Sequence, residues 1–492
     1  MKIKTSAIVY GIRYIRRFGL RTLIIRIIEK KREKDSEYQS FYLETKASLE
    51  QLENQRMEVS HWNKKEKISI VTPLYHTPAI FLRELIESVL ESSYENWQLC
   101  FADATQDGEE NQIENIVKEY QKMDEKLTGK KSRICYKKLS QNYGIAENTN
   151  QALAMAEGDY IAFLDHDDII TPDALYEMAL AAKCAKKTGK EANMFYSDED
   201  KVNENRTAFF EPHFKPDFNQ DLLNSNNYIT HFLMVSRELL DQVGGINKEY
   251  DGAQDYDFIL RCTELADNVI HIPKVLYHWR VHERSTAAGA GSKDYAIDAG
   301  KCAIESHLQR MGENGKVVVT PYFGFYRIEY GINTENKTED YVLFADQSLK
   351  PLNADWKQIL YADCSRKKIG VVGGKIYDRH HRIYEAAFFE KGDWTGAAFF
   401  EKGDWTGAAC GENVFSGLRE GYGGYMHRAN IQMDCDRVSE KCMLVKKEVL
   451  EQIEDYEQQI RTPEFSYIVC QKAKEMGYRI MYEPEVKMIF KS

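Results

Sequence analysis

The sequence predicts an α/β fold built on a mixed, doubly wound sheet. Short β-branched strands alternate with amphipathic helices over residues 66–168, which is typical of strands that run mostly parallel. Carboxylates follow two of these strands, with Asp103 after one and Asp165 after another. Both are therefore expected at the sheet edge where ligands of such folds bind.

The expected elements follow one another from residue 68. Residues 68–73 read as a strand that proline ends, and Thr77-Pro78 starts a helix whose apolar face spans 81–90. The other expected strands are 97–102, 133–137 and 160–164, and the other expected helices are 113–126 and 145–156.

Three carboxylates, Asp165, Asp167 and Asp168, directly follow the strand 160–164. Like charges this close repel one another and are costly to bury unpaired. Oxygen ligands of this kind suit Mg²⁺ or Mn²⁺, and either ion would bridge the phosphates of a nucleotide. The competing interpretation is a solvated acidic turn that caps the next helix, near Thr171-Pro172.

Charge is unevenly distributed along the chain. The formal net charge of the 492 residues is −11, yet the first 34 residues contain eleven Lys and Arg against two Glu, which leaves −20 for the rest. An acidic body argues against nucleic-acid binding. The basic leader reads as an amphipathic helix interrupted by Arg, which predicts peripheral association with the inner face of a membrane. A helix packed on the protein's own body is the alternative.

Targeting signals and cysteine spacing give weaker constraints. The sequence shows no signal peptide, no apolar run of spanning length and no C-x-x-C pair among its ten Cys. Zinc is therefore not expected, and reduced thiols in the cytoplasm are the simplest interpretation. Residues 35–63 read as a polar helical linker.

Four motifs in a fixed order carry a more specific signal. They are Thr72-Pro73-x-Tyr75, Ala102–Asp107, Asn142-x-Gly144-x-Ala146-x-x-x-Asn150 and Leu164–Asp168. This combination resembles family-2 glycosyltransferases, which have the GT-A fold, a nucleotide-binding half-sheet joined to an acceptor-binding half. The resemblance covers roughly residues 66–310.

The resemblance implies particular roles at the donor site. Asp103 would hold the nucleobase, Asp165 the ribose or the metal, and Asp167 the metal, which would be Mg²⁺ or Mn²⁺. Ala102 departs from the family, because an acid is common there. The donor-binding residues that the resemblance implies are Thr72, Pro73, Tyr75, Asp103, Asn142, Asp165 and Arg280.

The resemblance also implies a general base. Gln254-Asp255 resembles the family's Glu-Asp motif at the start of a helix, so Asp255 would take the proton of the acceptor hydroxyl. The alternative is an acid that serves only the helix dipole. His278 is the expected further metal ligand with His282 as second choice, although a lone His is often just packed.

Two further groups have less certain roles. Arg280 and Arg284 could clamp the leaving diphosphate or be ordinary surface charges. Asp198 and Asp200 lie in an acidic cluster that either lines the acceptor cleft or forms a solvated turn.

The chain after residue 316 reads as a damaged repeat of the first module. Residues 341–348 have the same pattern of apolar and polar residues as 160–167, but Ser348 stands where Asp167, the second expected metal ligand, stands in the first module. About 25 residues before this match are too few for two βα units, so the nucleotide-binding half is expected to be missing and the domain to be inactive. Residues 386–396 recur unchanged as 397–407, and one copy is expected to form a surface loop.

These observations predict three regions, 1–63, 64–315 and 316–492. The predicted function is inverting, metal-dependent transfer of a hexosyl or deoxyhexosyl group from a nucleotide-sugar to a cell-surface polysaccharide or lipid-linked glycan, with a homodimer possible. The nearest likeness is to bacterial rhamnosyltransferase-type enzymes. The alternative is a non-catalytic carbohydrate-binding scaffold. A nucleotidyltransferase is disfavoured, because no Gly-rich basic loop follows the first strand.

Overall fold

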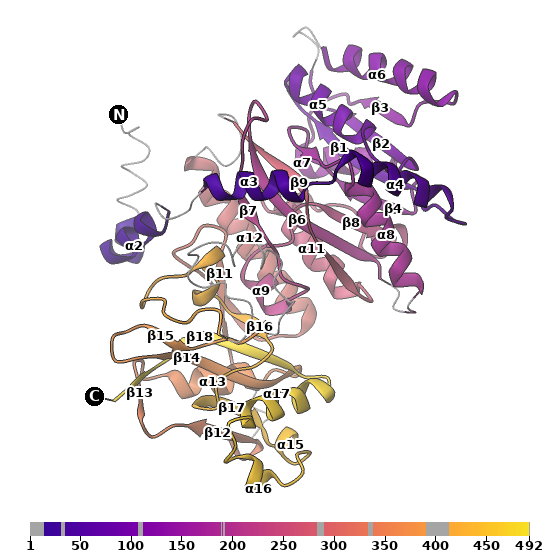
Figure 1. Ribbon diagram of the computed structural model, residues 1–492. Coiled ribbons are helices and arrows are strands. Elements are labelled where there is room, and N and C mark those ends of the chain that lie inside the picture. Colours follow the sequence, from indigo (N-terminus) through magenta and orange to yellow (C-terminus); the bar gives the residue numbers. More distant parts are fainter. Residues whose placement is uncertain are drawn as a thin grey trace. The chain divides into compact units, whose positions relative to one another are not determined.

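The computed structural model describes residues 14–30, 35–106, 112–187, 189, 192–282, 290–332, 338–389 and 413–491. The chain divides into two compact units, each shown in Figure 1. We call residues 34–218 and 229–303 the nine-stranded unit. Residues 1–33, 219–228 and 304–492 make up the seven-stranded unit. Most of the duplicated sequence 386–407 lies outside the described residues.

A mixed sheet forms the centre of the nine-stranded unit. Its order is β3-β2-β1-β4-β8-β6-β9-β5, with β7 paired to β6. Strands β3, β2, β1 and β4 are parallel, whereas β8 runs antiparallel to both β4 and β6. The strands are β1 (Ile68–Leu74), β2 (Trp97–Asp103), β3 (Ile134–Lys138), β4 (Tyr160–Phe163), β5 (Ile169–Ile170), β6 (Met194–Asn203), β7 (Phe209–His213), β8 (Leu233–Ser236) and β9 (Val269–Val281).

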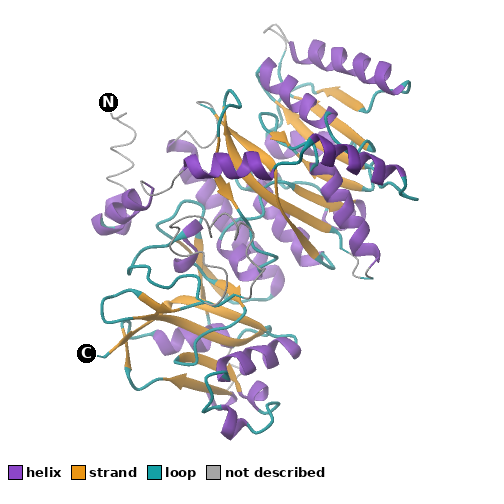
Figure 2. Ribbon diagram, in the orientation of Figure 1, coloured by secondary structure: helices purple, strands orange, loops and turns teal. Residues whose placement is uncertain are grey.

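Helices lie alongside this sheet, as Figure 2 shows. They are α3 (Asp35–Thr45), α4 (Leu49–Ser60), α5 (Ala79–Leu90), α6 (Gln112–Thr128), α7 (Ile145–Leu153), α8 (Ala174–Lys187), α10 (Arg237–Val243), η1 (Lys248–Tyr250), α11 (Gln254–Leu265) and α12 (Ala290–Met311). The apolar face of α5 packs with β1 and β2 into one continuous core. The predicted α/β fold with a mixed sheet is therefore confirmed.

Helix α3 is more than a linker. Tyr38 and Tyr42 are buried, and their hydroxyls bond to Asp200 Oδ2 (2.6 Å) and His278 Nε2 (2.8 Å). The backbone N–H of Phe209 on β7 donates to Gln39 Oε1 at 2.6 Å. The region that reads as polar in sequence therefore covers β6, β7 and β9 with two aromatic anchors.

The seven-stranded unit repeats one half of the first sheet. Its strand order is β12-β17-β14-β18-β13, with β15 paired to β14. This is the order of β4-β8-β6-β9-β5 with β7, and each corresponding pair has the same parallel or antiparallel sense. Nothing in the described part of this sheet corresponds to β1, β2 and β3. The described part of this sheet therefore contains only the half that corresponds to β4-β8-β6-β9-β5.

The elements of the seven-stranded unit follow in chain order. Strands are β10 (Gly315–Val319), β11 (Tyr326–Tyr330), β12 (Tyr341–Ala345), β13 (Leu349–Pro351), β14 (Ile369–Tyr377), β15 (Ile383–Glu385), β16 (Met433–Cys435), β17 (Cys442–Lys446) and β18 (Arg479–Phe490). Helices are α2 (Leu20–Lys30), α9 (Gln220–Ser225), η3 (Thr338–Asp340), α13 (Trp356–Cys364), η4 (Tyr425–Asn430), α15 (Lys447–Leu450), α16 (Tyr456–Gln459) and α17 (Phe465–Glu475).

Buried ion pairs hold α9 within the seven-stranded unit. Asp221 is bonded by Arg366 at 2.7 Å and by Arg479 at 2.9 Å. Arg479 also pairs with Asp434 at 2.6 Å. Breaking one partner of a buried pair leaves an uncompensated charge, so residues 219–228 are firmly tied to this unit although the chain before and after them belongs to the other.

Lys375 on β14 is a buried amine with one neutral partner, Asn430 Oδ1 at 2.7 Å. Burial, and next the neighbouring Lys487, lower the pKa of Lys375 to about 7. The unfolded chain then binds more protons than the folded one from about pH 7 to about pH 10, so the free energy of unfolding rises with pH over this window.

We expect K375M to abolish most of that rise, because the methionine fills similar space and has no proton to lose. Urea unfolding of both proteins at several pH values between about 7 and 10 measures the difference in slope. Equal slopes for the two proteins would contradict the assignment.

Candidate metal centre and active site

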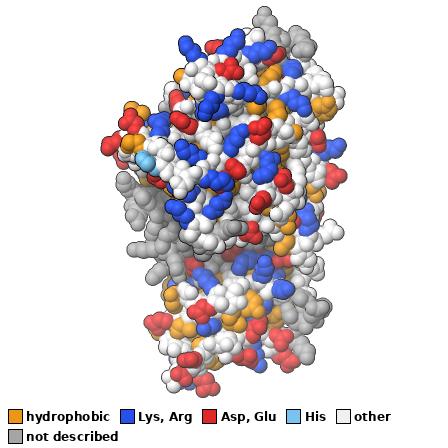
Figure 3. Space-filling model, turned by 90° about the vertical axis from the view of Figure 1, so that its right-hand side faces the viewer, with side chains coloured by type: hydrophobic (Ala, Val, Ile, Leu, Met, Phe, Trp, Pro, Cys, Tyr) orange, Lys and Arg blue, Asp and Glu red, His pale blue; other side chains and the backbone are white. Residues whose placement is uncertain are grey.

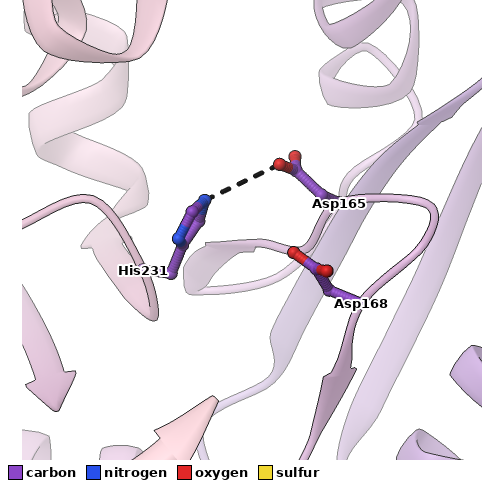
Figure 4. A group of neighbouring side chains, drawn as sticks. All are labelled: Asp165, Asp168 and His231. Atoms are coloured by element: carbon purple, nitrogen blue, oxygen red, sulfur yellow. Dashed lines mark ion pairs between the residues drawn. The ribbon is translucent and has the colours of Figure 1, made fainter. Parts of the chain in front are cut away.

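Three side chains converge beyond the end of β4. Asp165 follows β4, Asp168 precedes β5, and His231 precedes β8. Their ligand atoms all lie within 4.8 Å of one another, and His231 Nε2 is 3.6 Å from Asp165 Oδ2 (Figure 4). Of the residues that the structure describes, only these form such a group of His, Cys or acidic side chains.

The surroundings of Asp168 test whether a cation fits here. Its buried carboxylate accepts from the Tyr277 hydroxyl at 2.5 Å and from the backbone N–H of Arg280 at 2.7 Å. Burial, and next the charges of Asp167 and Asp165, raise the pKa of Asp168 well above its ordinary value. A divalent cation would offset both effects, so the two carboxylates and one imidazole fit a divalent cation.

The imidazole of His231 is held on two sides. Its ring stacks on the Tyr277 ring with centroids 4.6 Å apart and planes 7° from parallel. Its Nδ1 lies 3.1 Å from Glu199 Oε2. Burial acts to lower the pKa of His231, but Asp165 and Glu199 outweigh burial and hold that pKa well above its ordinary value. The stacking on Tyr277 and the contact of Nδ1 with Glu199 direct the Nε2 of His231 at Asp165.

Asp255 lies in the first turn of α11 and belongs electrostatically to the same group. Burial raises the pKa of this carboxyl, the charge of Asp165 raises it further, and His231 opposes both. A raised carboxyl pKa is closer to the working range of a general base. The neighbouring Asp257 is fully buried and paired with Arg261 at 2.8 Å, as expected of an acid that does not act on a ligand.

Five of the predicted donor residues lie on the parallel half of the sheet or in the turns that follow its strands. Thr72 and Asp103 are fully buried, and Tyr75 is 43% exposed. Pro73 follows Thr72 on β1. Asn142 Oδ1 accepts from the N–H of Gly144 at 3.0 Å, at the turn into α7. These positions agree with an edge built by β1, β2 and the β3–α7 turn.

Asp103 is surrounded by donors at the end of β2. Its carboxylate accepts from Thr105 N (2.9 Å), Tyr136 Oη (2.7 Å) and Lys138 Nζ (3.1 Å). Burial acts to raise the pKa of Asp103, but the hydrogen bonds from Tyr136 and Thr105 outweigh burial and keep that pKa below its ordinary value. The carboxylate is therefore ionised and oriented.

Two of the predicted metal ligands, His278 and Asp167, lie outside this group. His278 is buried, with Nδ1 2.5 Å from Asp200 Oδ1 and Nε2 2.8 Å from the Tyr42 hydroxyl. Both ring nitrogens of His278 are thus bonded inside the protein, and the histidine that belongs to the group is His231. Asp167 is bonded to His282 Nε2 at 2.9 Å and stays outside the group, which includes Asp168 instead.

Arg280 does not fit a diphosphate clamp, because its side chain is fully buried. Nε donates to Asp167 O at 2.6 Å, Nη1 donates to Glu204 O at 2.8 Å, and Nη2 pairs with Glu84 at 2.7 Å. Arg280 instead fixes the turn that presents the acidic cluster. Arg284 lies outside the described residues.

Asp198 and Asp200 do not line an acceptor cleft, because both are buried. Asp198 is paired with His271 at 2.9 Å, and Asp200 with His278 at 2.5 Å. The acidic run on β6 is therefore internal, and neither residue has a carboxylate facing solvent.

Sequence reasoning missed four residues of this site: Asp168 as a ligand, His231, Glu199 and Tyr277. Asp168 and Glu199 stand inside acidic runs whose other members seemed equivalent, and only sheet register separates them. His231 lies just before a β-strand in an otherwise polar stretch. A histidine at a strand end was the available signal.

The seven-stranded unit shows what the same half-sheet looks like without the site. Matching the strand registers of the two sheets aligns their positions. The residues at the positions of Asp165, Asp168, His231, Glu199 and Tyr277 are, in this order, Asp346, Leu349, Lys441, Ile376 and Met488. Lys441 Nζ pairs with Glu385 at 3.0 Å. The second copy therefore lacks the group of side chains that could bind a metal ion.

Part of the chain matches a known protein family. Residues 69–244 match the family described as "Glycosyl transferase family 2". An uncharacterized protein y4gI of Sinorhizobium fredii is 38% identical over 263 residues, 53% of this chain and 27% of that protein. The O-antigen biosynthesis protein RfbC of Myxococcus xanthus is 34% identical over 291 residues, 59% of this chain and 22% of that protein. The chain thus spans about a quarter of the length of these relatives.

Solved structures resemble the chain more distantly. The crystal structure of S. aureus TarS 1–349 in complex with UDP-GlcNAc has a TM-score of 0.38 and 18% identity, and the match covers 49% of this chain and 66% of that one. A mannosyltransferase from Pyrobaculum calidifontis in complex with GDP-Man and Mn²⁺ has a TM-score of 0.34 and 15% identity, covering 54% of this chain and 81% of that one.

We expect D165N and H231A each to weaken Mn²⁺ binding about tenfold or more, because each removes one ligand of the three. Isothermal titration with Mn²⁺ measures the affinity. The control is D346N in the second copy, where the carboxylate is exposed and accepts from the N–H of Ser348. Wild-type affinity in both site variants would contradict the assignment.

Proposed function

We propose that this chain, whose residues 69–244 match the family described as "Glycosyl transferase family 2", transfers a hexosyl or deoxyhexosyl group from a nucleotide-sugar to a growing cell-surface polysaccharide or a lipid-linked glycan, with inversion at the anomeric carbon. The observation that carries the proposal is the convergence of Asp165, Asp168 and His231 within electrostatic reach of Asp255.

Each side chain has a distinct task in this proposal. Asp255 removes the proton of the acceptor hydroxyl as the acceptor oxygen bonds to the anomeric carbon and the bond to the diphosphate breaks. Attack from the face opposite the leaving group inverts the configuration. Asp165, Asp168 and His231 would hold Mg²⁺ or Mn²⁺, which when bound neutralises charge on the leaving diphosphate. Asp103 binds and orients the nucleobase of the donor through its ionised carboxylate.

Two observations support a polysaccharide acceptor. The relative from Myxococcus xanthus is named an O-antigen biosynthesis protein, and a matching protein of Bacillus subtilis is named a putative teichuronic acid biosynthesis glycosyltransferase.

Basic and acidic side chains are interspersed on the face drawn in Figure 3, and the net charge is −11. We therefore expect no nucleic-acid partner.

The seven-stranded unit is proposed to be non-catalytic. Ser466 takes the place of Asp255 one residue into α17, just as Asp255 stands one residue into α11. Leu349 replaces one ligand and Lys441 another. Glycan binding or scaffolding suits this unit better than a second transfer reaction.

We expect D255N to lower kcat about 10²–10⁴-fold while leaving UDP affinity near that of the wild type, because the amide cannot accept a proton. Donor turnover is followed with UDP- and dTDP-sugars in the presence of Mn²⁺, and UDP affinity by calorimetry. Near-normal turnover by D255N would remove Asp255 as the base. Silence of the wild type in every nucleotide titration would favour a carbohydrate-binding scaffold.

Helix α2 supports the proposal of peripheral binding at the inner face of the membrane. Leu20, Ile24 and Ile27 are 57%, 48% and 49% exposed and share one helix face. On the other side, Arg26 Nη1 donates to Pro321 O at 2.9 Å. Residues 14–28 contain no acid. The exposed apolar face of α2 fits binding in the interface plane. None of the described helices is both long and apolar enough to cross a bilayer.

We expect the protein to float with vesicles of phosphatidylcholine containing phosphatidylglycerol, and much less with phosphatidylcholine alone. L20S/I24S/I27S should abolish flotation, and R16Q/R17Q should weaken binding roughly fivefold per arginine. L49S, which changes an 81%-exposed leucine on α4, is the control. Flotation that is insensitive to all substitutions in α2 would place the membrane contact elsewhere.

A further inference from the structure

Glu199 lies beside the candidate metal centre and has no step in the proposed reaction. Its carboxylate is buried on β6. Oε2 is 3.1 Å from His231 Nδ1 and accepts from the backbone N–H of His231 at 3.2 Å. The fully buried Lys215 lies 3.3 Å from the same oxygen. A buried carboxylate is costly, so its persistence here needs a reason.

Three consecutive acids on β6 each face a histidine. Asp198 pairs with His271 at 2.9 Å, Glu199 with His231 at 3.1 Å, and Asp200 with His278 at 2.5 Å. Alternate residues of a strand point to opposite faces, so the middle pair lies on a different face of the sheet from the outer two.

Only the middle histidine has its second nitrogen at the candidate site. The Nδ1 of His271 is 3.2 Å from Asp217, and the Nε2 of His278 is 2.8 Å from the Tyr42 hydroxyl. By contrast, the Nε2 of His231 points at Asp165 from 3.6 Å (Figure 4). The first two pairs close a packed interior, whereas the third leaves a nitrogen directed at the ligands.

Lys215 fixes the segment that carries His231. Its ammonium donates to Ile229 O at 2.6 Å and to His231 O, besides pairing with Glu199. Tyr277 stacks on the ring and donates to Asp168. Backbone, ring plane and Nδ1 of His231 are therefore all determined by neighbours that take no part in the chemistry.

The second copy gives an independent argument. At the positions of Glu199 and Tyr277 it has Ile376 and Met488, and at the position of His231 it has Lys441. The supporting residues have been lost together with the ligand, although the sheet itself is intact. Sheet formation therefore does not require a carboxylate at this position.

We propose that Glu199 is a positioning residue that holds one proton of His231 on Nδ1, so that Nε2, after losing its own proton, is the nitrogen that binds the divalent cation. A carboxylate is the suitable partner, because it only accepts hydrogen bonds and so fixes the tautomer of the imidazole. Lys215 compensates the buried charge of Glu199. The inference rests on the proposed function, since it assigns His231 to the metal.

The test measures Mn²⁺ binding by E199Q. An amide can present either an acceptor or a donor to Nδ1, so the tautomer is no longer fixed. We expect Mn²⁺ affinity to fall about 10- to 100-fold. D200N is the matched control, since it changes a carboxylate–histidine pair of the same sheet that points away from the site, and it should bind Mn²⁺ like the wild type.

Two further measurements separate positioning from damage to the fold. Pulsed electron paramagnetic resonance of bound Mn²⁺ should show a directly bound imidazole nitrogen in the wild type and none in H231A. In the H231A background, E199Q should cause little additional loss of Mn²⁺ affinity. A full additional loss, or wild-type affinity in E199Q alone, would overturn the proposal. Since Glu199 also neighbours Lys215, E199D, which keeps the charge, should retain more affinity than E199Q.

The proposed function can fail separately. Wild-type protein that binds Mn²⁺ with an imidazole nitrogen but turns over no nucleotide-sugar would refute the transferase and leave the role of Glu199 intact. Normal turnover with no imidazole signal would refute the role of Glu199 and leave the transferase intact.

Discussion

Repulsion among carboxylates at the end of β4 is the constraint around which the site is arranged. Asp168 is buried and feels the charges of Asp167 and Asp165. His282 partners Asp167 at 2.9 Å, whereas the nearest cationic group to Asp165 is His231 at 3.6 Å. The proposed divalent cation would offset the repulsion that these partners leave.

The neighbouring residues keep this arrangement from relaxing. The backbone N–H of Arg280 donates to Asp168 Oδ1, and its Nε donates to Asp167 O. The hydroxyl of Tyr277 accepts from the N–H of Asp165 at 3.3 Å and donates to Asp168. Turn and carboxylates are thus fixed by buried groups, so a ligand would meet a site that is already organised, which lowers the entropic cost of binding.

The sequence predicted which strand ends carry chemistry, because a carboxylate after a short apolar strand is a local pattern. Asp103 and Asp165 were singled out in this way, β1 to β4 were predicted from their apolar patterns, and Asp255 was proposed only from the resemblance of Gln254-Asp255 to the family's Glu-Asp motif. It could not predict which acids of the run from Asp198 to Asp200 face inward, because that depends on the register of β6 against β9, which shifts twice beside Asp198. His278 was preferred over His282, and His231 was not considered as a ligand, because the contacts of these histidines with Tyr42, Asp167 and Glu199 join residues that lie far apart in sequence.

The repeated half-sheet separates what the fold needs from what the chemistry needs. Both copies keep the five-strand order and the helices that follow the strands, so neither depends on acids at the strand ends. In the second copy Leu349 replaces the buried Asp168, and the ammonium of Lys441 stands at the position of His231, paired with Glu385. In the second copy the ammonium of Lys441 therefore stands where the first copy has His231, the imidazole that would bind a metal ion. A carboxylate cluster and an imidazole persist in one of two equivalent half-sheets, and folding alone does not account for them, which supports the proposed cation site.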